Sequence, residues 1–129
     1  MELNDLINKA HEVVGQYRSS DDCTSGGVGA ALTTKTGNVY TGVCIDCSCS
    51  LGFCAEHSAI AEMLKHKESE IAMIVAINEK KEIAPPCGRC RELIYQVNKS
   101  NIDTQIVLSE NKTIPLKELL PYRWQEIWA

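Results

Sequence analysis

The sequence predicts one α/β domain built in three layers (α/β/α), with helices on both faces of a mixed sheet of five strands. Three observations predict this fold class. Apolar residues recur every three or four positions from Leu3 to Tyr17, which is the period of an amphipathic helix. Residues 71–77 form a continuous apolar run of strand length, as expected for a central strand covered on both faces. Strand and helix patterns alternate along the chain, which is typical of α/β domains.

Two runs near the N-terminus predict a β-hairpin. Residues 27–33 and 39–45 carry the strand patterns, with a polar turn at 35–38 between them. Residues 19–27 interrupt the helical periodicity and predict no regular element. The other expected elements are strands at 105–108 and 113–114 and a brief helix that Pro115 opens and that runs through Leu120.

Two further helices are predicted to begin at cysteines. Cys54 precedes an apolar pattern spaced three and four apart, and Cys87 and Cys90 stand at the start of a second such pattern. The first turn of a helix exposes unpaired N–H groups and the positive end of the dipole, which lowers a thiol pKa and favours the thiolate. The sequence therefore predicts a pocket where two helix starts face each other.

The spacing of these thiols predicts a hydrolytic zinc site with one zinc per chain. Cys54, Cys87 and Cys90 can fill three corners of a tetrahedron and leave the fourth for water. Glu56 is free to move a proton, and Arg89 and Arg91 can donate hydrogen bonds that offset the thiolate charge. Alone, the C-x-x-C would fit a redox or structural role and Glu56 a solvated surface position; together they favour catalysis.

Composition narrows the class of protein. The chain has 129 residues, 44% of them hydrophobic, which is enough to bury a core as a single domain spanning 1–129. The net charge of −4 and the pI of about 5.4 argue against binding to nucleic acid. A polar start and the lack of a long apolar run predict a soluble, cytoplasmic protein that does not bind membranes.

The seven cysteines include four outside the predicted zinc site. The odd number, the size of the core and the absence of a secretory signal predict reduced thiols. A second zinc site and a redox pair are alternatives for these four, but their spacing suits neither well and we expect small buried side chains. The four are Cys23, Cys44, Cys47 and Cys49.

At Cys54-Ala55-Glu56 and at Pro86-Cys87-Gly88-Arg89-Cys90 the sequence resembles the zinc-dependent cytidine deaminase family, in its free-nucleoside, homotetrameric branch. The likeness continues at 28–32 and 119–124. It implies that the backbone N–H of Ala55 and the carbonyl of Pro86 orient a cytosine base. It also implies that Trp124 reaches into a neighbouring subunit's site and that the assembly is a homotetramer acting in pyrimidine salvage.

Three positions depart from the family pattern. Cys44 and Asp46 stand where the family carries the Asn and Glu that hold the sugar hydroxyls, and His57 stands where many tetrameric members carry an Arg that tempers the thiolate charge. The resemblance implies deamination of cytidine or deoxycytidine. A modified cytosine nucleoside such as blasticidin S is an alternative substrate. A non-catalytic zinc-stabilised binding module is the second alternative, and it would need a fourth protein ligand.

Overall fold

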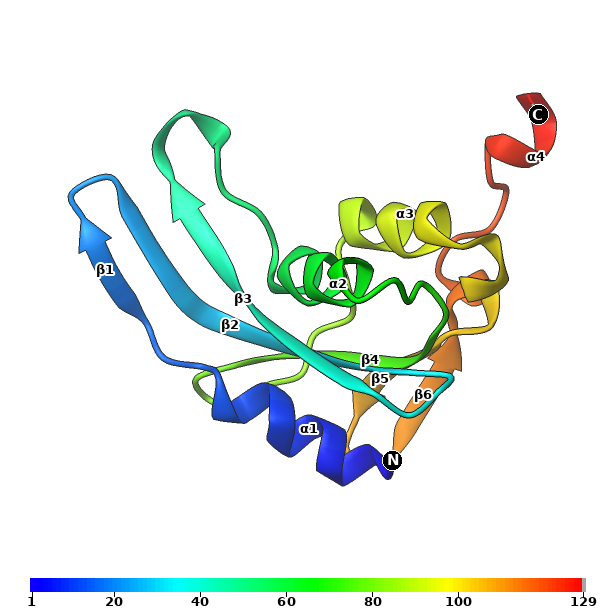
Figure 1. Ribbon diagram of the computed structural model, residues 1–129, viewed down its shortest axis with the longest axis horizontal. Coiled ribbons are helices and arrows are strands. Elements are labelled where there is room, and N and C mark those ends of the chain that lie inside the picture. Colours follow the sequence, from blue (N-terminus) through cyan, green and yellow to red (C-terminus); the bar gives the residue numbers. More distant parts are fainter. Residues whose placement is uncertain (129) are drawn as a thin grey trace.

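A computed structural model describes residues 1–128 of the chain. These residues form one sheet with helices on both faces, so the three-layer α/β/α expectation is confirmed (Figure 1). The strands are β1 (Tyr17–Ser20), β2 (Cys23–Thr34), β3 (Val39–Cys47), β4 (Ile71–Asn78), β5 (Gln105–Ser109) and β6 (Lys112–Pro115). The helices are α1 (Leu3–Glu12), α2 (Ala55–Lys65), α3 (Gly88–Val97) and α4 (Gln125–Trp128), with short 3-10 turns at Ser48–Ser50, Lys99–Asp103 and Leu116–Glu118. None of the helices in residues 1–128 could cross a bilayer.

The sheet within residues 1–128 has six strands rather than the predicted five. Its order is β1-β2-β4-β5-β6, with β3 paired to β2, and only β4 and β5 run parallel. The additional strand is β1, which starts at Tyr17, the last residue of the expected first helix, and continues into the segment 19–27, where we predicted no regular element. The helix instead ends at Glu12, shortly before Gly15, a residue type that disfavours helix. The brief helix expected from Pro115 through Leu120 is a 3-10 turn over Leu116–Glu118.

Strand β2 changes partners along its length. Its first residues, Cys23 to Ser25, pair with β1, whereas Val28 to Thr34 pair with β4. The change occurs at Gly26, whose φ of 85° lies in the left-handed region that favours glycine. Strand β3 stays beside β2, so the ends of these two strands extend past β4 together with β1 (Figure 1). We call this extension the arm and define it as residues 17–25 and 44–50.

Alternating side chains of the central strands divide the core into two clusters. Ala31 and Val75 point to one face, where they pack with Leu6 and Ala10 of α1. Leu32 and Ile74 point to the other face, under α2 and α3. This period-two alternation on strands that are covered on both faces explains the continuous apolar run in the sequence of β4.

Helix α2 lies unusually close to β3, and a glycine makes this possible. A Cβ atom at Gly42 would lie 2.4 Å from the backbone nitrogen of Ala59, far inside van der Waals contact. Any larger residue would push the helix off the sheet. The close approach fixes the start of α2, and with it Cys54 and Glu56, relative to the strands.

Candidate metal centre

The predicted thiols lie at two helix starts that face each other. Cys54 is the N-cap of α2 and Cys87 is the N-cap of α3, and both have extended backbone dihedral angles. Cys90 lies in the first turn of α3 and is fully buried. The expected helix starts are thus confirmed, and the two segments meet although 33 residues separate Cys54 from Cys87 in the sequence.

The three sulfur atoms form a compact triangle. The Sγ of Cys87 lies 3.5 Å from the Sγ of Cys54 and 3.5 Å from the Sγ of Cys90. The donor atoms of Cys54, Cys90 and His57 all lie within 4.8 Å of one another. Zinc–thiolate bonds of about 2.3 Å place the sulfurs of a tetrahedral site about 3.8 Å apart. The triangle therefore fits a zinc ion, and the donors are of the type that zinc prefers.

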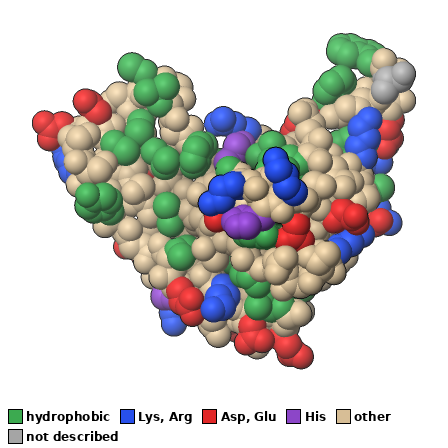
Figure 2. Space-filling view, viewed as in Figure 1, with side chains coloured by type: hydrophobic (Ala, Val, Ile, Leu, Met, Phe, Trp, Pro, Cys, Tyr) green, Lys and Arg blue, Asp and Glu red, His purple; other side chains and the backbone are tan. Residues whose placement is uncertain are grey.

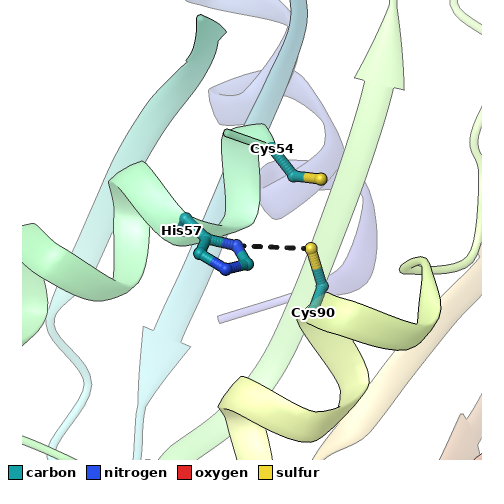
Figure 3. Close-up of side chains that lie close together, drawn as sticks. All are labelled: Cys54, His57 and Cys90. Atoms are coloured by element: carbon teal, nitrogen blue, oxygen red, sulfur yellow. Dashed lines mark hydrogen bonds between the residues drawn. The ribbon is translucent and has the colours of Figure 1, made fainter. Parts of the chain in front are cut away.

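His57 adds a nitrogen donor beside the triangle (Figure 3). Its Nδ1 lies 3.5 Å from the Sγ of Cys90, and its ring stacks on Phe53 at 6.3 Å between centroids. Burial, followed by the charge of Arg89, lowers the pKa of His57 and favours the neutral imidazole. A neutral ring can donate one hydrogen bond to a thiolate or ligate a metal. The positive charge that a protonated His57 would bring is therefore disfavoured.

Without a cation, the thiols do not all ionise at neutral pH. Burial and the charge of Glu56 raise the pKa of Cys90, and burial together with the Cys87 thiol raises that of Cys54. The pKa of Cys87 is lowered: burial opposes ionisation, but backbone and thiol hydrogen bonds from Cys90 outweigh it. A bound dication would displace the remaining protons, so metal binding and deprotonation are coupled at this centre.

Glu56 lies in the first turn of α2 and is only 6% exposed. Burial raises the pKa of its carboxyl, and hydrogen bonds from its own backbone N–H and the Cys90 thiol offset part of this effect. A carboxyl group with a raised pKa can hold a proton at one stage of a reaction and release it at another. Its environment is therefore suited to proton transfer next to the sulfur triangle.

The centre opens into a groove of about 1070 Å³. One wall is the arm, which contributes Cys23, Thr24, Asp46 and Cys47. The other is formed by the start of α2 and by four residues before and at the start of α3, which are Ala84, Pro85, Cys87 and Arg89. Figure 2 shows the hollow between the arm and the helices. Small-molecule sites usually enclose about 300 to 1,000 Å³. The groove is thus large enough for a nucleoside that carries a further substituent.

Of the residues expected to contact substrate, Cys44, Asp46 and Ala55 line the groove. Pro86 is buried and does not line it; the neighbouring Pro85 does. Trp124 does not line the groove of its own chain either. It directly precedes α4, which lies at the opposite end of the molecule from the arm (Figure 1), and its ring packs edge-on against Trp128 at 6.0 Å between centroids. Trp124 therefore makes no contact with the groove of its own chain.

The two arginines differ in their surroundings. Arg89 lines the groove, as expected for a residue near the metal. The hydrogen bonds of Arg91 go to carbonyl groups rather than to thiols: Nε donates to the Pro86 oxygen at 2.7 Å and Nη1 to the Leu119 oxygen at 3.2 Å. Its guanidinium group thus connects the loop that carries the thiols to the C-terminal segment, a role that the sequence did not indicate.

The structure also brings residues to the groove that the sequence analysis did not select. Cys23 and Cys47 are directly opposite each other on β2 and β3, and Arg18 and Asp22 lie beside them. We had expected both cysteines to be buried, but each is only partly buried. Both cysteines fell outside the strands that we predicted at 27–33 and 39–45, and it is the observed register of the longer strands that pairs them.

Comparison with known protein families gives a match over most of the chain. The model described as the cytidine and deoxycytidylate deaminase zinc-binding region matches residues 2–106. Blasticidin-S deaminase of Bacillus cereus is 34% identical over 109 residues, which are 75% of this chain and 76% of that protein. A probable cytidine deaminase of Dictyostelium discoideum is 36% identical over 67 residues, or 50% of this chain and 46% of that protein.

Solved structures agree with the fold. The crystal structure of cytidine deaminase from Mycobacterium tuberculosis has a TM-score of 0.78 at 23% identity, with 95% of this chain and 96% of that chain covered. Cytidine deaminase from Burkholderia pseudomallei has a TM-score of 0.73 at 27% identity, with 95% and 98% covered. The arrangement of helices around the sheet is therefore shared over nearly the whole length of both chains.

Proposed function

The chain belongs to the cytidine and deoxycytidylate deaminase zinc-binding family, and from that premise we propose that it hydrolyses the exocyclic amino group of a free cytosine nucleoside. The family places it among zinc-dependent hydrolases that deaminate cytosine. Cytidine and deoxycytidine are the proposed substrates, and uridine or deoxyuridine and ammonia the products. Such a reaction would return uracil nucleosides to pyrimidine salvage in the cytoplasm.

One observation carries the proposal: a buried carboxyl group, Glu56, lies beside a sulfur triangle at the wall of an open groove. A purely structural zinc site has no use for a buried acid of raised pKa that faces a cavity. A hydrolase needs both parts, since water must lose one proton and the leaving amine must gain one.

Cys54, Cys87 and Cys90 are the proposed ligands, and zinc in this position would lower the pKa of a water molecule at its open corner. Glu56 takes the proton from the attacking water and delivers it to the ring N3. It then carries the second proton to the amino group at C4, which leaves as ammonia. The N–H of Ala55, at the wall of the groove, and the carbonyl of Pro86 are the proposed groups that orient the base.

The groove supports a second candidate substrate, a modified cytosine nucleoside of the blasticidin S type. The Sγ of Cys44 accepts a hydrogen bond from the backbone N–H of Val28 at 3.3 Å. It lacks the amide that an Asn would offer to a ribose hydroxyl. Asp46 is exposed on the arm, and its carboxylate can accept a hydrogen bond from a hydroxyl of the sugar. The relative with 34% identity is named for blasticidin S, which agrees with a site that is not built for plain ribose.

The decisive experiment measures ammonia release from cytidine, deoxycytidine and blasticidin S in parallel with zinc-loaded protein. Preference for the first two supports the plain nucleoside, and preference for the third supports the modified one. Release from none of them, with one zinc still bound per chain, would favour the non-catalytic binding module. Glu56→Gln serves as the control, because it must abolish release from whichever substrate is active.

We also propose that the active assembly is a homotetramer whose neighbouring chain supplies Trp124. The support is the position of Trp124, which is half exposed and does not line its own groove, next to Trp128, which is 83% exposed. Closed assembly would cover these aromatic surfaces. Sedimentation at micromolar concentration and KM values for Trp124→Ala test the proposal. An active monomer, or an unchanged KM, would refute it.

A further inference from the structure

Two thiols outside the metal centre form a close pair on the groove wall. The Sγ of Cys47 lies 3.2 Å from the Sγ of Cys23, and the two residues are directly opposite each other in the antiparallel pairing of β3 with β2. Directly opposite residues in such a pair have Cα atoms about 4.5 to 5.5 Å apart. This span is within the usual range for disulfides, so a bond requires the two sulfurs to approach from 3.2 Å to about 2.05 Å.

The pair is chemically separate from the other cysteines. Within residues 1–128, a group of three or more donors placed to hold a metal occurs at Cys54, His57 and Cys90 and does not include Cys23 or Cys47. Cys49 is exposed and Cys44 is buried, and the sulfur of Cys44 is near Asp46 at 3.8 Å. The pair therefore has two donors that face each other, which suits a covalent bond better than a tetrahedral ion.

We propose that Cys23 and Cys47 are a dithiol modification site that forms a reversible disulfide with low-molecular-weight disulfides. The reaction does not depend on the deaminase activity. It adds a second kind of thiol chemistry to the groove.

The reaction is ordinary thiol–disulfide exchange in two steps. The Cys23 thiolate attacks one sulfur of glutathione disulfide, which forms a mixed disulfide and releases one glutathione thiolate. The Cys47 sulfur, after losing its proton, attacks the Cys23 sulfur of that mixed disulfide and releases the second glutathione. The protein loses two hydrogen atoms, two protons pass to the two glutathione thiols, and glutathione disulfide is reduced by two electrons.

The surroundings assign the roles of the two thiols. Hydrogen bonds from the side chain of Ser19 and from the Cys47 thiol lower the pKa of Cys23. The same contact with Cys23, followed by burial, raises the pKa of Cys47. Cys47 is the hydrogen-bond donor and Cys23 the acceptor, so Cys23 is the attacking thiolate and Cys47 the resolving thiol.

The strand ends are already held in place for the bond. The backbone N–H of Ser48 donates to the Asp22 carbonyl oxygen at 3.2 Å, and its hydroxyl lies 3.3 Å from the Asp22 carboxylate. These contacts adjoin the thiol pair on both strands. Because the second thiol is fixed next to the first, its capture of the mixed disulfide is effectively intramolecular and should be strongly favoured.

The test incubates the zinc-loaded protein in glutathione buffers of graded disulfide content, followed by acid quenching, alkylation and mapping of cross-linked peptides by mass spectrometry. We expect one cross-link, between Cys23 and Cys47, that exceeds the mixed disulfide by at least about tenfold. Excess reduced glutathione should reverse it, and zinc content should stay constant. Stable mixed disulfides without a cross-link, cross-links to other cysteines, or no reaction would each overturn the proposal.

Two serine variants complete the design. Cys47→Ser should abolish the cross-link and leave glutathione attached at Cys23, whereas Cys49→Ser, a nearby exposed thiol, should leave the cross-link unchanged. Loss of the cross-link in Cys49→Ser would contradict the assignment. If Cys47→Ser fails to fold, the peptide map of the native chain still decides the question.

Discussion

Two groups of cysteines lie on the same groove and have different geometries. At the metal centre, three sulfurs and one imidazole from two helix starts converge on a single point, with 3.5 Å between neighbouring donors. On the arm, two sulfurs from adjacent strands face each other at 3.2 Å. Donor atoms that converge on one point can enclose a metal ion, whereas two thiols that face each other are placed to form a disulfide. The number and direction of the donors, more than the residue type, decide the chemistry.

Removing one thiol from each group gives the largest contrast. Cys90→Ala should lose zinc and turnover together and should unfold at a lower temperature, because zinc joins the starts of α2 and α3. Cys47→Ala should keep one zinc per chain. Atomic absorption and thermal unfolding measure both effects. Equal metal content in the two variants would show that the ligands are assigned incorrectly.

Glu56 tests whether the metal centre is catalytic rather than structural. Glu56→Gln preserves the size of the side chain but cannot shuttle protons, so turnover should fall by about 10² to 10⁴-fold while zinc stays bound. Glu62→Gln, on the same helix but paired with Lys65 at the surface, is the matched control and should retain activity. Retention of activity in Glu56→Gln would argue for another proton carrier.

His57 distinguishes an open zinc site from a closed one. If it only donates a hydrogen bond to the Cys90 thiolate, His57→Arg should keep the zinc and change activity by about 10 to 100-fold at most, the usual effect of a group next to a ligand. If His57 is the fourth ligand, the variant should lose metal as Cys90→Ala does. Zinc titration with a chelating dye separates the two results.

Arg91 tests whether the loop of the metal centre depends on the C-terminal segment. Arg91→Lys keeps the charge but cannot reach both the Pro86 and Leu119 carbonyls. We expect a KM several-fold higher, a nearly unchanged kcat and unaltered zinc content. Equal losses in both constants would indicate that Arg91 acts on the chemical step. Arg123→Lys, which bonds to Glu126 and Leu120 in the tail, is the control.

The smallest effect is expected at the turn of the β2–β3 hairpin, far from both thiol groups. Hydrogen bonds from Thr36, Tyr40 and Asn38 lower the pKa of Glu68 from its ordinary value of 4.5 to about 2. A lowered folded-state pKa adds stability above the unfolded pKa, and this stability is lost as the pH falls. Unfolding of the native chain and of Glu68→Gln should therefore converge between about pH 4.5 and pH 2. A constant difference in the free energy of unfolding over this range would show that ionised Glu68 does not stabilise the turn.

Each half of the metal centre was predictable because its geometry is local, whereas the meeting of the two halves depends on the whole fold. Cys54 and Cys87 are N-caps, Cys90 lies three residues after Cys87, and helical period fixes where such residues lie. The pairing of Cys23 with Cys47 was not predictable, because strand register depends on the whole hairpin and a shift by one residue would turn the thiols apart. The same limit applies to β1, whose exposed residues carry no alternating pattern, and to Arg91, whose partners are carbonyls of distant segments.

The change of partners in β2 at Gly26 has a consequence for how this enzyme can acquire new substrates. Both core clusters draw on β2 residues after this point, beginning at Val28, and of the arm only Cys44 belongs to either cluster. Substitutions on the rest of the arm can therefore reshape the side of the groove that meets the sugar without reaching the residues that hold the helices on the sheet. Libraries restricted to residues 17–25 and 45–50 would vary what the protein accepts while the proton-transfer machinery stays the same.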